Sequence, residues 1–285
     1  MIRDERIDHL VQPMLQAMPA QAIEEEHDDE IVGTILTRRQ ALSVASKAGL
    51  TLLAAGGSSK AGRGQAVTGN RPVSLVATPQ VTEGPFFVDE KLNRSDVRTG
   101  TTRTSVTNAM PLLLTMSVFK LTIGSLRAYQ PYANAYVDIW CADALGVYSD
   151  EPRGMNAENT VGQKWLRGYQ VTGTNGVAAF TMIWPGFYMG RTPHIHFKIR
   201  TYNASGNTTM TFTSQFFFND ATSDAIFKNS PYRQRSAGDT YNTNDNVYSA
   251  RQADGTMVGT HLMLSVTQNA AAGRYEAVFN VALTS

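Results

Sequence analysis

Short hydrophobic or alternating runs, separated by turns rich in glycine, asparagine and proline, recur along the chain from about residue 75 to its end. Such runs, without a long stretch of helical periodicity, are typical of β-strands in a sandwich or barrel. We therefore predict an all-β domain over residues 75–285, a β-sandwich of short, mostly antiparallel strands with long loops. The predicted strands are Leu112–Ile123, Tyr136–Ala142, Tyr169–Thr172, Val177–Ile183, Ile195–Thr201, Met210–Phe218, His261–Thr267 and Tyr275–Ala282.

Two histidines lie in the most regular of these runs. Strand side chains alternate between faces, so His194 and His196 share one face while Ile195, Phe197 and Ile199 share the other. The hydrophobic face is expected to pack on the core, and the two imidazoles can then converge on one metal ion. The alternative is a pair of polar residues on a solvated strand face.

The first 74 residues have a different pattern. Residues 1–36 combine hydrophobic positions at helical spacing, from Ile7 to Met18, with an acidic run at Glu24–Glu30, and we interpret them as a polar, amphipathic extension. Residues 37–57 place Arg38 and Arg39 before a short, weakly hydrophobic run, which resembles a twin-arginine export signal. Residues 58–74 read as a small-residue linker. The alternative for residues 37–57 is a surface helix with two basic residues at its start.

The composition restricts the classes of function. Of 285 residues, 42% are hydrophobic, the net charge is +1, and there is one cysteine, Cys141. The small net charge gives no support to nucleic-acid binding, and we expect no disulfide framework and a buried, inert thiol at Cys141. We find no stretch long and hydrophobic enough to span a membrane in the mature protein. If the signal is used, the protein is exported by the twin-arginine machinery to the periplasm or outside the cell; otherwise it stays in the cytoplasm.

Three stretches together carry a resemblance to a known family. They are Val137–Trp140 continuing to Gly146–Ser149, Trp165–Gln170, and Trp184–Tyr188 followed by Arg191–His196. They resemble the intradiol ring-cleaving dioxygenases of the catechol and protocatechuate type, and most of all the exported single-domain members. The entry segment Thr82–Phe86 is similar to the opening of that family, so the resemblance covers roughly residues 75–285.

The resemblance implies one non-haem Fe(III) per chain, held by Tyr148, Tyr188, His194 and His196. Two phenolates suit a hard ferric ion, and a free phenol, with a pKa near 10, ionises at neutral pH only beside a strong Lewis acid. The implied reaction opens a catechol-type aromatic diol with O2 to a cis,cis-muconate-type product, with Tyr188 as a general base.

Further roles follow from the same resemblance. Arg191 is expected to stabilise developing negative charge on the substrate. Gln215 is expected to lie near the site and to orient the residues that bind the metal or substrate, without binding either itself. Gly84, Pro85 and Phe86 are expected to line the substrate cavity.

Several alternatives stay open at this point. Each tyrosine could be a structural residue at the core edge, Arg191 could pair with a surface carboxylate, and residues 84–86 could form a β-turn.

Trp165 is expected in the core, and His261 is expected to be structural. The segment from about Asn219 to Gly255 is predicted to be a long polar loop of functional importance. The chain could instead be a β-sandwich module that binds an aromatic ligand or carbohydrate without turnover, or a zinc-dependent hydrolase using the two histidines. The oligomeric state is open.

Overall fold

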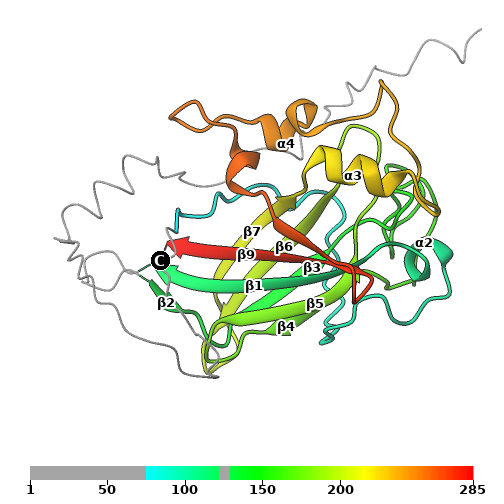
Figure 1. The fold of residues 1–285 in the computed structure, drawn as a ribbon. Helices are drawn as coiled ribbons and strands as arrows, with labels where there is room; N and C mark the ends of the chain where they lie inside the picture. Colours follow the sequence, from blue (N-terminus) through cyan, green and yellow to red (C-terminus); the bar gives the residue numbers. More distant parts are fainter. Residues whose placement is uncertain (1–74, 122–128, 285) are drawn as a thin grey trace, which may run out of the picture.

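The computed structural model describes residues 75–121 and 129–284. Two β-sheets lie in two layers, with β9, β1 and β5 in front of β7, β6 and β3 in Figure 1. Sheet A has the strand order β4-β3-β6-β7, and sheet B has the order β2-β1-β9-β8, with β5 also paired to β1. The strands are β1 (Pro111–Leu121), β2 (Tyr129–Pro131), β3 (Tyr136–Trp140), β4 (Arg167–Val171), β5 (Val177–Ile183), β6 (His194–Tyr202), β7 (Thr208–Phe217), β8 (Ser265–Asn269) and β9 (Arg274–Thr284).

The predicted sandwich is confirmed, and so is its mostly antiparallel pairing. Among the described strands only the β1–β9 pair is parallel. Ile195, Phe197 and Ile199 of β6 are fully buried in the core that both sheets share, as their alternation predicts. Trp165 and Cys141 lie in the same core, and burial raises the pKa of the Cys141 thiol, which keeps it protonated and inert.

The segment from Asn219 to Gly255 is not the single loop that its polar composition predicts. It contains helices α3 (Asp220–Phe227) and α4 (Asn246–Ser249) and the short 3-10 helix η1 (Asn242–Asn244). Asn219 caps α3 by accepting a hydrogen bond from the Thr222 backbone N–H. Arg235 binds the carboxylates of Asp220 and Asp224 and its guanidinium lies over the Phe227 ring, so tertiary contacts hold this segment in shape.

One further expectation needs correction, and one strand was missed. The strand predicted to begin at His261 begins at Ser265, because residues Val258–His261 form the 3-10 helix η2, and His261 therefore ends a helix. The short strand β2 was not predicted, since three residues are too few to show an alternating pattern. Helix α2 (Thr104–Thr107) completes the elements of the described residues.

The extension of residues 1–36, the export signal of residues 37–57 and the linker of residues 58–74 lie outside the described residues, and so does the end of the first predicted strand at residues 122–123. These stay predictions. In the described part of the chain, no helix is both long enough and apolar enough to cross a membrane.

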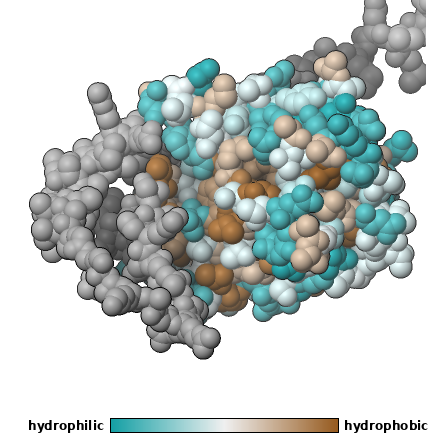
Figure 2. Space-filling model, in the orientation of Figure 1, coloured by the Kyte–Doolittle hydropathy of each residue, from teal (hydrophilic) through white to brown (hydrophobic). Residues whose placement is uncertain are grey.

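The outer face of sheet B is turned to the viewer in Figure 2, where hydrophobic residues gather toward the middle of the face and hydrophilic residues lie above and to the right of them. Val278 of β9 is an exposed hydrophobic residue of this sheet. The predicted site residues His194 and His196 belong to sheet A instead, on the opposite layer.

Candidate metal centre

The two histidines begin strand β6 and are almost completely buried, with 2% of His194 and 1% of His196 exposed. They lie on the face of sheet A that points away from the shared core. His196 is paired with Trp140 of β3 on one side and with Gln215 of β7 on the other. The Trp140 indole stacks on the His196 imidazole, with centroids 4.9 Å apart and planes 8° from parallel. The alternative of a solvated histidine face is therefore wrong.

Tyr148 reaches the histidines from the loop that follows β3. The Asp143 carboxylate shapes this loop by accepting hydrogen bonds from the backbone N–H groups of Leu145 and Val147, at 2.8 and 3.1 Å. Asn156 then brackets the Tyr148 backbone: its Oδ1 accepts from the Tyr148 N–H, and its Nδ2 donates to the Tyr148 carbonyl. Tyr148 is 1% exposed, so this residue is a rigid, buried member of the site.

Tyr188 comes from a second loop, between β5 and β6, which packs directly on the first. A tight turn closes it, in which the Arg191 N–H donates to the Tyr188 carbonyl. The loops touch at Gly146, whose φ is +83° and where a Cβ would overlap the carbonyl oxygen of Phe187. Only glycine combines this backbone conformation with so close a contact.

Replacing Gly146 with alanine should therefore cost about 2–5 kcal/mol, from backbone strain together with the forced separation of the two loops. Gly190 is the matched control, since it has a similar φ of +82° but no atom within 4 Å of the position that a Cβ would take. Gly190→Ala should cost only the backbone strain of about 1–2 kcal/mol. Urea unfolding of the three proteins measures both costs. Equal losses for the two variants would mean that the contact between the loops is unimportant.

Four donor atoms converge between these loops and β6. His194 Nε2 lies 3.0 Å from His196 Nε2, 3.3 Å from Tyr148 Oη and 3.4 Å from Tyr188 Oη. In the described part of the chain, no group of three or more His, Cys, Asp or Glu side chains could hold a metal by itself. A metal at the histidine pair would therefore depend on the tyrosine oxygens.

The hydrogen bonds of the imidazoles fit a cation at this point. His194 Nδ1 lies 2.6 Å from the Thr192 carbonyl oxygen, so Nδ1 carries the proton and donates it, leaving the Nε2 lone pair directed into the cluster. His196 Nδ1 is buried without a hydrogen-bond partner. If His196 is protonated there, two Nε2 lone pairs face each other at 3.0 Å, an arrangement that a shared cation would relieve. Two phenols and two imidazoles are a donor set that suits ferric iron.

Burial shifts the protonation of these groups in the metal-free protein. Burial, aided by the Arg191 charge, lowers the pKa of His194 to about 3, and burial lowers the pKa of His196 well below its usual value. Burial and the neighbouring Tyr188 raise the pKa of Tyr148 well above that of a free phenol. The imidazoles are therefore neutral and ready to bind a metal, whereas Tyr148 loses its proton only to a strong Lewis acid.

The metal-free protein should consequently lose stability as the pH falls from about 6.5 toward 4. In that window the unfolded histidines bind protons and the folded ones do not, so acid favours unfolding by up to about 1.4 kcal/mol per pH unit for each of them. Denaturant unfolding of the metal-free protein at pH 7 and pH 5 measures the loss. A variant with both histidines changed to glutamine should lose less stability between pH 7 and pH 5. An unchanged loss in this variant would show that the two histidines do not cause the pH dependence.

The segment expected to line the substrate cavity lies against the four donors. Gly84 is in contact with His196, because a Cβ there would be 3.1 Å from His196 Cε1. Phe86 is buried and stacks on the Tyr148 ring at a centroid distance of 4.3 Å, while Pro85 is exposed. All three residues are thus beside the site, and their contact with substrate stays a prediction.

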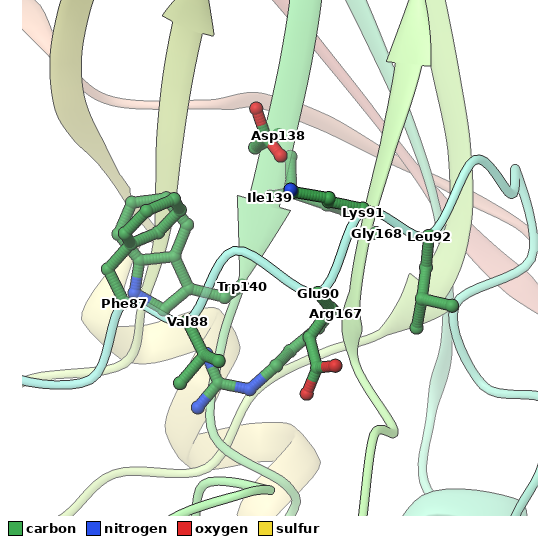
Figure 3. A pocket seen from close by; sticks show the side chains of 10 residues that line it. All are labelled: Phe87, Val88, Glu90, Lys91, Leu92, Asp138, Ile139, Trp140, Arg167 and Gly168. Carbon is green, nitrogen blue, oxygen red and sulfur yellow. The ribbon is translucent and has the colours of Figure 1, made fainter.

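Behind Trp140 lies a small cavity of about 10 Å³. Trp140 and Phe87 lie together at one side of it and Leu92 lies at the other (Figure 3). A space of this size holds no more than a water molecule. It is therefore not a substrate cavity. Trp140, which lines it, also stacks on the His196 imidazole.

Arg191 and Gln215 are in direct contact, and their roles toward a substrate stay predictions. Arg191 Nη2 donates to Gln215 Oε1 at 2.6 Å, and Gln215 Nε2 donates to the Thr82 carbonyl at 3.1 Å. Arg191 Nε donates to Asp245 Oδ2 at 2.9 Å. Arg191 is 6% exposed and Asp245 is fully buried, so the alternative of pairing with a surface carboxylate is wrong. Asp245 was not predicted, because an aspartate in a polar segment carries no sign in the sequence of a partner 54 residues away.

Comparison with known proteins decides the family. No family model and no curated protein matches the chain. The structure of an intradiol ring-cleavage dioxygenase from Tetranychus urticae does match, with 29% sequence identity and a TM-score of 0.58, over 74% of this chain and 95% of that protein.

This chain belongs to the intradiol ring-cleavage dioxygenases. A second crystal structure of a dioxygenase matches it with 29% identity and a TM-score of 0.56, over 73% of this chain and 94% of the other. The chain is thus an enzyme. The alternatives of a binding module without turnover and of a zinc hydrolase have no support among these matches.

Proposed function

We propose that this dioxygenase binds one ferric ion through Tyr148, Tyr188, His194 and His196 and cleaves a catechol-type diol with O2. The observation that carries the proposal is the convergence of four donor atoms: two phenol oxygens and the Nε2 atom of His196 all lie within 3.4 Å of His194 Nε2. Ferric iron bound by these donors would act as a Lewis acid that keeps the phenols and the diol oxygens ionised.

The two tyrosines are suited to different tasks. Tyr148 is enclosed by Phe86 and its backbone is held at both ends, so it can serve as a permanent ligand. Tyr188 is half-buried and lies in a turn next to the exposed Met189, where it can meet an incoming substrate. We assign Tyr188 Oη as the base that accepts one of the two hydroxyl protons of the diol.

Arg191 supplies positive charge on the substrate side of the site. Its guanidinium is held by Asp245 at Nε and by Gln215 at Nη2, so its orientation is fixed before the substrate binds. A fixed cation stabilises negative charge that develops on the ring of an ionised diol without reorganising during the reaction.

The reaction balances without a further reductant. Catechol and one O2 give cis,cis-muconic acid: the carbon–carbon bond between the two hydroxyl-bearing carbons breaks, and each of these carbons gains one oxygen atom from O2. The ring is oxidised by four electrons in all, and O2 accepts them.

The test is turnover by the iron-loaded protein with catechol, hydroxyquinol, protocatechuate and chlorinated catechols. We expect O2 uptake in a one-to-one ratio with a ring-opened dicarboxylic acid for at least one of these diols. With ¹⁸O2, mass spectrometry should find label in both new carboxyl groups. Cleavage beside the diol, or no cleavage of any of these compounds by protein shown to hold iron, would contradict the proposal.

A further inference from the structure

Asp245 joins the segment between α3 and η2 to the candidate metal centre. Its side chain is fully buried and accepts four hydrogen bonds. Oδ1 accepts from the backbone N–H groups of Val247 and Tyr248, both at 3.0 Å, and so caps helix α4. Oδ2 accepts from Arg191 Nε at 2.9 Å and from the Thr192 backbone N–H at 3.0 Å. One oxygen thus holds the helix and the other holds the start of the histidine segment.

The first consequence concerns Arg191. With Nε bound to Asp245 and Nη2 bound to Gln215, the guanidinium plane is fixed at two of its edges. Gln215 is in turn fixed by the Thr82 carbonyl, and it lies opposite His196 in the pairing of β7 with β6. Loss of the Asp245 contact would release one edge of the plane and let the charge turn away from the substrate.

The second consequence concerns His194. Thr192 donates its backbone N–H to Asp245, and its carbonyl accepts the proton of His194 Nδ1 at 2.6 Å. The Thr192 hydroxyl lies 3.0 Å from Asn242 Oδ1, which adds a second contact to the same segment. Thr192, whose carbonyl fixes the tautomer of His194, is therefore held in place by Asn242 and Asp245, which are distant from it in the sequence.

The charge of Asp245 is maintained in this buried position. Burial alone would raise the pKa of the carboxyl, but the positive charge of Arg191 and the hydrogen bonds from Arg191 and Tyr248 hold it below its usual value. The Asp245 carboxylate and the Arg191 guanidinium form a buried ion pair, in which each charge is compensated by the other.

We infer that Asp245 is a positioning residue for the ring-cleavage reaction, acting through the orientation of Arg191 and through the Thr192 carbonyl that sets the His194 tautomer. The inference rests on the proposed function for its catalytic part. Asp245 does not itself donate to or accept from any of the four metal-donor atoms in the contacts described above, so its effect is transmitted by these two residues. The part of the polar segment around Asn242 and Asp245 thereby gains a role as the support of the site.

The test uses Asp245→Asn, because asparagine is also a good helix cap. If the amide oxygen keeps the cap, the amide NH2 faces the Arg191 and Thr192 N–H groups, and donor meets donor. We expect kcat to fall about 10²-fold with little change in KM, as for a catalytic group displaced by about 1 Å. The control is Asp224→Asn, which makes the same change in the pair with Arg235, and it should retain the kcat of the unmodified enzyme.

Two further measurements separate positioning from general damage. In the metal-free protein, hydrogen exchange at the Thr192 amide should become faster in Asp245→Asn, while the Val247 and Tyr248 amides stay protected. In an Arg191→Gln background, the additional change Asp245→Asn should lower kcat by much less than about 10²-fold, because the path through Arg191 is already broken.

The outcomes distinguish the two proposals. If the unmodified, iron-loaded enzyme cleaves no diol, the proposed function fails, and the exchange of the Thr192 amide still tests the positioning. If the enzyme is active and Asp245→Asn keeps its kcat, or exchange at Thr192 is unchanged, the positioning inference is wrong. A full loss of about 10²-fold in the Arg191→Gln background would also refute transmission through Arg191.

Discussion

Replacing Tyr148 with phenylalanine should lower the rate of ring cleavage by a factor of at least about 10³. The change deletes one of four converging donor oxygens and nitrogens from a buried site. A metal ion contributes several kcal/mol to such a reaction, and about 4 kcal/mol corresponds to a factor of about 10³. Tyr188→Phe should be less severe for iron binding, since Tyr188 is half-buried, but should slow the binding of the diol because its proton acceptor is lost.

These variants are compared by iron content, by visible absorption and by kcat and KM on one diol. The matched control is Tyr169→Phe, a half-buried tyrosine of β4 whose ring packs on Tyr136 outside the site. It should retain iron, colour and activity. Tyr148→Phe protein that holds a full equivalent of iron with an unchanged spectrum would show that Tyr148 is not a ligand.

The second large effect is expected at Arg191. Arg191→Met removes the cation and leaves the buried Asp245 carboxylate unpaired, so we expect a loss of about 3–5 kcal/mol in stability. We also expect kcat to fall about 10²–10³-fold, because a fixed charge near the reacting ring is gone. Unfolding in urea and steady-state kinetics measure the two effects.

A double variant separates stability from catalysis. Adding Asp245→Asn to Arg191→Met removes the unpaired charge, so most of the lost stability should return. The activity should stay low, since the cation is still absent. If activity returned together with stability, the role of Arg191 would be structural and its assignment to charge stabilisation would be wrong.

Much of the sandwich can be predicted from the sequence because alternation is a local property. The residues Ile195, Phe197 and Ile199 show which face of β6 is buried, and this places His194 and His196 together on the other face. Strand ends are less well determined. In the run at His261, Leu262 and Leu264 are buried although they belong to no strand: they follow the 3-10 helix η2, and the strand begins at Ser265.

The site is only partly visible in the sequence. The histidine pair is a local signal, but Tyr148 and Tyr188 lie in separate loops, and only the resemblance to a family singled them out. Asp245 and Asn242 lie 54 and 50 residues beyond their partners Arg191 and Thr192. Asp245 before Val247 and Tyr248 has the pattern of a helix cap, which predicts the start of α4. Nothing local predicts that the second carboxylate oxygen reaches Arg191, because that contact depends on how this segment packs against the loop that precedes β6.

The central claim is that two tyrosines and two histidines form a ferric site, and the visible absorption spectrum of the purified protein, measured together with its iron and zinc content, tests it most directly. We predict a coloured protein with about one iron per chain, because ferric phenolate absorbs strongly in the visible, and a shift of that band when catechol is added without air. A protein that stays colourless after ferric iron is supplied, or that holds zinc in place of iron, would contradict the account.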